Sequence, residues 1–208
     1  MSNGRVFTDI ADGYDRINRV LSVGRDRVWR RSAIAKLPPG RILDLGAGTG
    51  AANVDLGLQD LVALDPSPEM LRLNPAHMRV VGVGERLPFI DRAFDAVFSA
   101  YVLRNLDSVP DTLAELARVL RPGGMAGIVD LGRPTNAAAA ALHRVGSKVV
   151  LGAVGRLVGN PEEYRYLGES LGKLPQPEVM FADGPLDLVE VWRMGPLDFV
   201  YGALLVKP

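Results

Sequence analysis

The sequence contains no cysteine, and only His77 and His143 carry an imidazole among its 208 residues. The lack of cysteine excludes disulfides, thiolate metal sites and a cysteine nucleophile. Two histidines without thiolates do not match the ligand sets of structural zinc sites. We therefore expect no bound metal and no catalysis through a thiol.

An excess of charge of either sign is also missing. The chain has 24 basic and 24 acidic side chains, so its formal net charge is zero. A neutral chain exerts no global electrostatic attraction on nucleic acid. We expect no nucleic-acid partner, and the composition does not indicate an oligomeric state.

Long hydrophobic runs are absent too. Residues 1–12 lack a continuous apolar core of signal-peptide length, and no stretch approaches the roughly 20 apolar residues that span a bilayer. We therefore expect a cytoplasmic protein, with peripheral contact with a membrane left open. The length fits one domain over residues 1–208.

The order of apolar runs and turns predicts alternating strands and helices. Residues 6–37 have a helical apolar face that Pro38-Pro39-Gly40 ends, so we expect residues 1–39 to form an N-terminal helical cover. Residues 109–120 repeat the helical pattern. Strands are predicted at 41–45, 61–64, 78–83, 93–99, 125–131, 189–194 and 199–206.

This alternation predicts an α/β fold of the Rossmann-like doubly wound class. We expect a mostly parallel seven-stranded sheet with an antiparallel C-terminal strand, in three α/β/α layers. Residues 137–181 interrupt the alternation, and we interpret them as an insertion or lid on the substrate side. Within them, residues 137–158 are rich in alanine and valine, but their glycines weaken a rigid helix.

A glycine-rich loop, Asp44-Leu-Gly-Ala-Gly-Thr-Gly50, follows the first predicted strand directly, and Asp65 follows the second. Glycine is needed where the backbone approaches a ligand closely or takes a positive φ angle, and a helix that follows offers free N–H groups. An acidic residue at the carboxyl end of a strand can accept both hydroxyls of a ribose. The pair of motifs predicts a nucleoside site.

The glycine spacing separates two kinds of nucleoside site. A dinucleotide fingerprint is G-x-G-x-x-G, whereas the third glycine here comes one residue early, at Gly50. This spacing resembles motif I of the class I S-adenosylmethionine-dependent methyltransferases. A turn with only a structural role and an NAD enzyme remain as alternatives.

Four further blocks resemble the ubiquinone/menaquinone biosynthesis C-methyltransferase family. The resemblance implies that S-adenosylmethionine is the cofactor and that a small hydrophobic acceptor, a prenyl quinol, receives the methyl group on carbon. The blocks are Val6-Phe-Thr-Asp-Ile-Ala11 with Tyr14-Asp15, Glu85-Arg-Leu-Pro-Phe89, Leu103-Arg-Asn105 with Arg118-Val-Leu-Arg-Pro-Gly-Gly124, and Tyr164-Arg-Tyr-Leu-Gly-Glu-Ser170.

The resemblance also implies a set of cofactor-binding residues. Asp65 would hold the ribose, Val83 and Gly84 would face adenine, and Arg31 would reach the methionine carboxylate. The alternative is that Arg31 is a solvated helix residue that contacts no ligand. The full set is Arg31, Asp44, Gly46, Ala47, Gly48, Thr49, Gly50, Asp65, Pro66, Val83, Gly84, Glu85 and Ala100.

Two departures from the family pattern concern the cofactor side. The family usually offers adenine a polar side chain at the position of Val83. The stretch between Gly50 and Leu61 is short, which predicts a truncated first crossover helix. On the acceptor side, Gly168 replaces a usual proline, and residues 202–206 lack a histidine that is often found there.

Methyl transfer to a ring carbon requires an electron-rich acceptor. A cation that stabilises a phenolate would help, and Arg104 with Asn105 at the end of the fourth strand are the candidates. Tyr14 and Tyr101 are candidates for shaping or hydrogen-bonding the ring. The alternative for Arg104 is a surface ion pair, and no general base is evident.

Three functions follow from these features. The first is quinol C-methylation, and the second is methylation of another small hydrophobic phenol or secondary metabolite. The third is a protein that binds S-adenosylmethionine without catalysis, if Val83 weakens the site.

Overall fold

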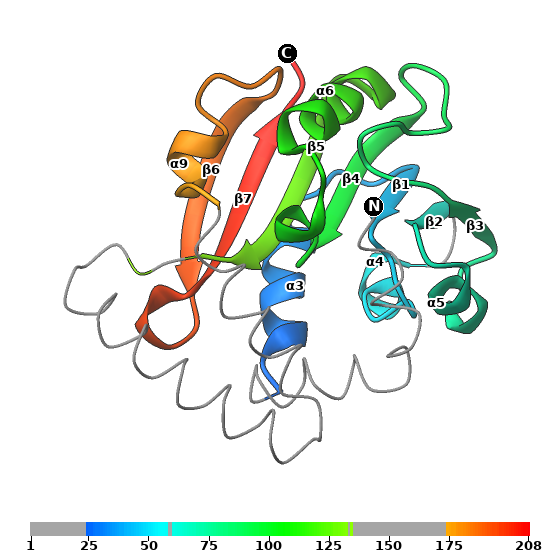
Figure 1. Cartoon of the computed structure of the whole chain (residues 1–208), viewed down its shortest axis with the longest axis horizontal. Coiled ribbons are helices and arrows are strands. Elements are labelled where there is room, and N and C mark those ends of the chain that lie inside the picture. The colour runs from blue at the N-terminus through cyan, green and yellow to red at the C-terminus, as the bar shows by residue number, and fades with distance from the viewer. Residues whose placement is uncertain (1–23, 58–59, 133, 135–173) are drawn as a thin grey trace.

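The computed structural model describes residues 24–57, 60–132, 134 and 174–208 (Figure 1). The strands of this part form one seven-stranded sheet in the order β3-β2-β1-β4-β5-β7-β6. The strands are β1 (Ile42–Leu45), β2 (Leu61–Asp65), β3 (Met78–Val81), β4 (Phe94–Ala100), β5 (Leu120–Leu131), β6 (Asp187–Met194) and β7 (Val200–Val206).

The strand directions confirm the predicted fold class. β1 lies parallel to both β2 and β4, β3 is parallel to β2, and β5 is parallel to β4. β7 is antiparallel to both β5 and β6. The sheet is therefore mostly parallel with an antiparallel C-terminal strand, and its parallel strands end at one common edge, the carboxyl edge.

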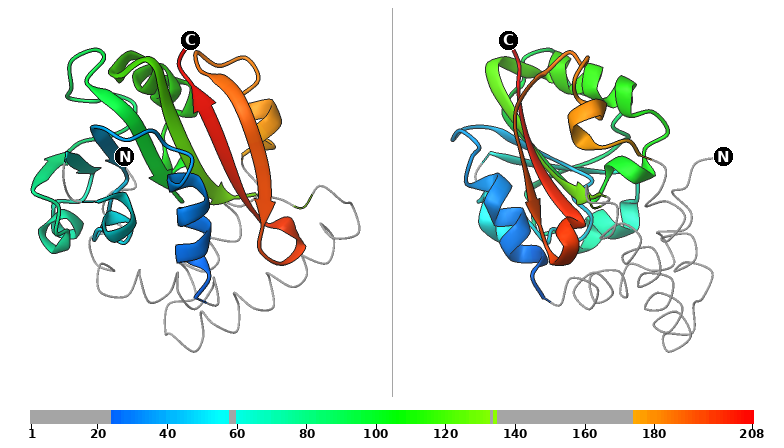
Figure 2. Two further views of the ribbon diagram at one scale, coloured as in Figure 1. Left: turned by 180° about the vertical axis from the view of Figure 1, so that it is seen from behind. Right: turned by 90° about the vertical axis from the view of Figure 1, so that its left-hand side faces the viewer.

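Helices cover both faces of the sheet, which gives the predicted three layers (Figure 2). The helix α3 (Asp26–Ile34) lies on one face, where Trp29 packs with Phe98 and Val129. The other face carries α6 (Val109–Val119) and α9 (Pro177–Met180). The other helical elements of the described residues are α4 (Asn53–Leu56), α5 (Pro68–Leu73), η1 (Leu103–Asn105) and η2 (Pro196–Asp198).

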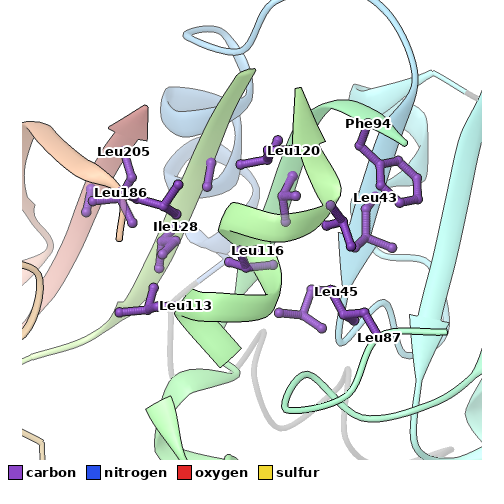
Figure 3. Close-up of a cluster of buried hydrophobic side chains, with 14 of the residues drawn as sticks. Leu43, Leu45, Leu87, Phe94, Leu113, Leu116, Leu120, Ile128, Leu186 and Leu205 are labelled. Atoms are coloured by element: carbon purple, nitrogen blue, oxygen red, sulfur yellow. The ribbon is translucent and has the colours of Figure 1, made fainter. Parts of the chain in front are cut away.

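The helix α6 shows how the sequence forms the core. Its N-cap residue Ser108 accepts a hydrogen bond from the backbone N–H of Asp111 at 3.3 Å, which satisfies an otherwise unpaired helix donor. Leu113 and Leu116 recur at helical spacing, and both are buried against the sheet (Figure 3). One core cluster therefore lies between α6 and the strands whose carboxyl ends position the site.

Several element boundaries differ from those predicted. The first crossover helix, α4, has four residues, as its short segment predicts. β3 ends at Val81 instead of residue 83. β5 begins at Leu120 instead of Met125, because Leu120 pairs with Phe94 and the strand continues through an irregularity. Residues 1–23 of the predicted cover and residues 137–173 of the predicted lid lie outside the described residues.

Candidate functional site

A cavity opens at the carboxyl edge of the sheet, where β1, β2 and β4 end. The residues around it come from α3, the glycine-rich loop, the segment after β2 and the turn after β4. They are Arg30, Asp44, Gly46, Ala47, Gly48, Thr49, Ala51, Ala52, Asp65, Pro66, Ser67, Met70, Phe98, Ala100, Tyr101, Val102 and Asn105.

The glycine-rich loop forms one wall of this cavity through its backbone. The φ angles of Gly46 and Gly48 are +71° and +51°, in the left-handed region that side chains disfavour. A Cβ atom on Gly46 would lie 2.3 Å from Cγ2 of Val102. The N–H of Gly46 donates to the carbonyl of Leu64 at 2.8 Å, which ties the loop to β2. The loop is thus a backbone cradle that leaves room for a ligand.

The carboxylate of Asp65 is fixed at the end of β2. Its Oδ2 accepts from the backbone N–H of Gly48 at 2.9 Å, and its Oδ1 accepts from that of Ser67 at 2.9 Å. Burial raises the pKa of Asp65, and the two N–H donors oppose this shift. Each carboxylate oxygen can accept a further hydrogen bond. Asp65 can therefore receive a pair of ligand hydroxyls without moving.

Asp44 and Arg30 bring buried polar atoms without partners to the same cavity. Oδ2 of Asp44 has no hydrogen-bond partner, and neither has Nε of Arg30. Burial and the nearby Asp65 raise the pKa of Asp44 to about 7, whereas Arg30 lowers it. Arg30 is also paired with Asp26 at 2.8 Å. Buried polar atoms normally have partners, so an acidic and a basic side chain with unpartnered atoms at one cavity are compatible with a ligand that carries both positive and negative groups.

The turn after β4 forms the opposite wall. Tyr101 has a φ of +64°, a strained conformation for a residue with a side chain. Its backbone N–H donates to the carbonyl of Val129 at 2.7 Å, while its buried hydroxyl has no partner. Burial raises the Tyr101 pKa, so the hydroxyl stays protonated. Nδ2 of Asn105 donates to the carbonyl of Tyr101 at 3.4 Å, which closes the turn.

Arg104 does not line this cavity. Only 8% of its side chain is exposed, and its guanidinium lies 3.6 Å from Oδ1 of Asp130. Asp130 is fully buried. The alternative expected for Arg104 was a surface ion pair, but the ion pair that it forms with Asp130 is buried.

The cavity brings together most of the predicted cofactor residues and two of the predicted catalytic residues. These are Asp44, Gly46, Ala47, Gly48, Thr49, Asp65, Pro66, Ala100, Tyr101 and Asn105.

Arg31 is placed elsewhere. Its side chain is 57% exposed, and its Nε donates to Oδ1 of Asp55 at 2.8 Å. The neighbouring Arg30 lines the cavity instead. The helical periodicity of the sequence could have identified Arg30 as the cavity residue, because Trp29 and Ala33 define the buried face of α3 and Arg30 falls on that face.

Gly50 and the Val83–Glu85 segment lie outside the cavity lining. A Cβ atom on Gly50 would meet Pro75 at 2.7 Å, so this glycine serves close packing. Val83 is 44% exposed, and a Cβ atom on Gly84 would meet Thr112. Oε1 of Glu85 accepts from the backbone N–H of Asp107 at 2.8 Å and that of Ser108 at 3.2 Å. The predicted Tyr14 lies outside the described residues.

Comparison with known proteins identifies the family. The model of the ubiE/COQ5 methyltransferase family matches residues 2–190. The chain belongs to this methyltransferase family. It is 40% identical over 181 residues to a demethylmenaquinone methyltransferase of Corynebacterium efficiens, covering 83% of this chain and 79% of the relative. It is also 40% identical over 183 residues to one of Mycobacterium tuberculosis, with coverages of 84% and 78%.

Solved structures share the fold. A SAM-dependent methyltransferase from Thermotoga maritima superposes with a TM-score of 0.70 at 15% identity over 99% of each chain. One from Aquifex aeolicus gives 0.58 at 17% identity, over 93% of this chain and 98% of the other. As a member of the ubiE/COQ5 family the chain is an S-adenosylmethionine-dependent methyltransferase, which sets aside the NAD alternative.

The residues around the cavity fit S-adenosylmethionine. The cofactor has an ammonium and a sulfonium for the unpartnered oxygen of Asp44, and a carboxylate for the unpartnered Nε of Arg30. Its ribose has two hydroxyls for Asp65.

Among the described residues, no helix is both long and apolar enough to cross a bilayer.

Proposed function

We propose that this methyltransferase transfers the methyl group of S-adenosylmethionine to a ring carbon of a demethylated menaquinol. The observation that carries the proposal is the 40% identity, over more than four fifths of the chain, to proteins named demethylmenaquinone methyltransferase. The cavity at the carboxyl edge supports it, because open α/β sheets hold their ligands there.

Four features of the cavity would hold the cofactor. The carboxylate of Asp65 would accept hydrogen bonds from both ribose hydroxyls, since its two oxygens are already oriented by backbone N–H groups. The backbone at Gly46 and Gly48 would allow close approach of the cofactor. Arg30 would pair with its carboxylate, and Asp44 would face its positive groups.

The chain's contribution to catalysis would be positioning and electrostatics. When bound, S-adenosylmethionine supplies a methyl group on a sulfonium, a leaving group that needs little acid assistance. Ala100 and Tyr101 would lie at the methionine end and fix the direction of approach. The role predicted for Tyr14 stays a prediction, because this residue lies outside the described residues.

The acceptor becomes nucleophilic when its ring hydroxyl loses a proton. Asn105 lines the cavity and could donate to the resulting phenolate, while Arg104 would stabilise that charge from its buried position. The bound cofactor would supply the methyl group to the ring carbon, and the hydroxyl proton and the ring-carbon proton would both leave to solvent.

The acceptor's prenyl tail bears on where the reaction takes place. A long tail keeps a quinol in the bilayer, so we propose that the protein acts from the cytoplasm in peripheral contact with the membrane. Co-sedimentation with vesicles that contain the quinol would measure this contact.

The proposal is tested with methyl-labelled S-adenosylmethionine and demethylmenaquinone that has been chemically reduced. We expect label in the product as a new ring carbon–methyl bond, and none when the quinone is left unreduced. A methyl group on oxygen would contradict the proposal, as would no transfer by protein that binds the cofactor. Transfer to another phenol would favour the second candidate function, and binding without transfer to any acceptor would favour the non-catalytic one.

A further inference from the structure

Asp130 is the second-to-last residue of β5 and begins a row of polar side chains across three strands. Its Cα lies opposite that of Tyr201 on β7, and Tyr201 lies opposite Arg193 on β6. Arg193 is paired with Glu178 of α9 at 2.5 Å. Asp130 and Tyr201 are buried. A carboxylate as fully buried as that of Asp130 is costly unless it is paired and hydrogen-bonded, so its partners are of interest.

The carboxylate of Asp130 is directed at the turn that follows β4. Its Oδ2 accepts from the backbone N–H of Leu103 at 2.8 Å, and the N–H of Val102 also donates to it. Its Oδ1 accepts from the backbone N–H of Leu131 at 2.7 Å and lies 3.6 Å from the guanidinium of Arg104. One side chain thus holds the backbone of this turn and its arginine together.

The same turn forms one wall of the cofactor cavity. Tyr101, Val102 and Asn105 line the cavity, and Val102 fits against Gly46 of the glycine-rich loop. The strained φ of Tyr101 requires surrounding contacts to hold it. Asp130 supplies such contacts from the neighbouring strand, so the position of this wall depends on it.

Stability alone does not explain the buried ion pair between Asp130 and Arg104. A buried ion pair gains little over a well-packed apolar pair, and it becomes costly when one partner is lost. The pair does hold the guanidinium of Arg104 in place at the carboxyl edge, next to the turn whose backbone Asp130 also binds.

We propose that Asp130 is a positioning residue for methyl transfer. It holds the turn of residues 101–105 and the guanidinium of Arg104 at the carboxyl edge of the sheet, so that the acceptor meets a fixed wall and a fixed charge. The catalytic part of this inference rests on the proposed acceptor.

The test compares Asp130→Asn with the double variant Arg104→Gln/Asp130→Asn. Asp130→Asn should lower kcat by about 10²-fold, the cost of a misplacement near 1 Å, with a smaller change in cofactor affinity. The double variant removes the charge together with its counter-ion, so it should recover the melting temperature but not kcat. Recovery of kcat in the double variant would overturn the proposal, as would unchanged kcat in Asp130→Asn.

Asp95→Asn is the matched control. Asp95 also accepts a backbone N–H, from Arg41 at 2.8 Å, and is paired with Arg121, but it lies at the opposite edge of the sheet. The kcat of Asp95→Asn should stay within about twofold of the kcat of the parent enzyme, because distant sites without shared partners act independently.

A second measurement does not depend on the acceptor. Amide hydrogen exchange over residues 101–106 should become faster in Asp130→Asn and stay unchanged in Asp95→Asn. Unchanged exchange in Asp130→Asn would overturn the positioning role even with an active enzyme. If the parent enzyme does not methylate the quinol, the proposed acceptor is wrong, and the exchange result alone decides whether Asp130 holds the turn.

Discussion

Asp44 and Asp130 occupy equivalent places in the sheet but have opposite surroundings. Each is the second-to-last residue of a parallel strand, β1 for Asp44 and β5 for Asp130, and each is buried. Asp130 accepts backbone N–H groups on both oxygens and faces Arg104. Asp44 keeps one oxygen without a partner, and that residue lines the cavity.

The difference separates a binding role from a positioning role. A buried carboxylate with an unpartnered oxygen carries a desolvation cost that a ligand can relieve. A buried carboxylate whose oxygens are all engaged instead fixes the groups that engage it. Substitutions at Asp44 should therefore act on cofactor binding, and substitutions at Asp130 should act on the fold and on turnover.

The largest expected effect is on stability. Asp130→Ala leaves the buried guanidinium of Arg104 without its counter-ion, so it should lower the free energy of unfolding by about 3–5 kcal/mol. Asp44→Ala removes a buried carboxylate that has an unpartnered oxygen, and its effect should stay within about 1 kcal/mol. Urea unfolding of both variants measures the difference. Equal losses would remove the distinction between the two aspartates.

The next effect is on cofactor affinity. Asp65→Ala removes the oriented carboxylate that we propose as the acceptor for the ribose hydroxyls, so it should weaken S-adenosylmethionine binding by about 1.5–3 kcal/mol. Titration calorimetry measures the affinity directly, and Asp60→Ala, just before β2, is the control. Unchanged affinity in Asp65→Ala would move the ribose away from this strand end.

A third effect appears in the pH dependence of binding. The positive groups of the cofactor favour ionised Asp44, so binding should lower its raised pKa and release a proton. Affinity should therefore rise with pH and level off above about 7, being roughly tenfold weaker one pH unit below that value. The contribution of Asp44 to folding stability has the opposite pH dependence. It falls as pH rises towards 7, because the pKa of this buried carboxyl is raised in the folded state.

Calorimetry in buffers of different ionisation enthalpy counts the released proton. Asp44→Asn should abolish the release and flatten the pH profile, while Asp26→Asn should retain both. A parent enzyme that binds without proton release near neutral pH would contradict the role given to Asp44.

The sequence predicts which residues meet at the cavity because most of the determinants are local. The glycine spacing and Asp65 directly follow strands, and strand ends of a parallel sheet meet at one edge, so neighbours in the motif become neighbours in space. The same reasoning recovers the seven strands and their mostly parallel arrangement, with errors of a few residues at element ends such as the start of β5.

The surroundings of Arg104 are less predictable because their contacts join distant segments. Asp130 meets Arg104 across 26 positions and Tyr201 across an antiparallel pairing, and no local spacing indicates either contact. Arg30 was missed for another reason. Choosing between adjacent arginines needs the direction of the buried helix face, which Trp29 and Ala33 set.

The smallest expected effect concerns Val83, where the family usually has a polar side chain. Val83 follows β3, the neighbour of the strand that carries Asp65, and its side chain is 44% exposed. If the adenine extends from the ribose past the end of β3, Val83→Asn should add one hydrogen bond and tighten binding by about 0.5–1.5 kcal/mol. Val81→Asn is the control, because Val81 is also exposed, at 58%, but lies within the strand. Equal changes in both variants would mean that adenine does not reach this position, and weaker binding in a folded Val83→Asn would place an apolar contact there instead.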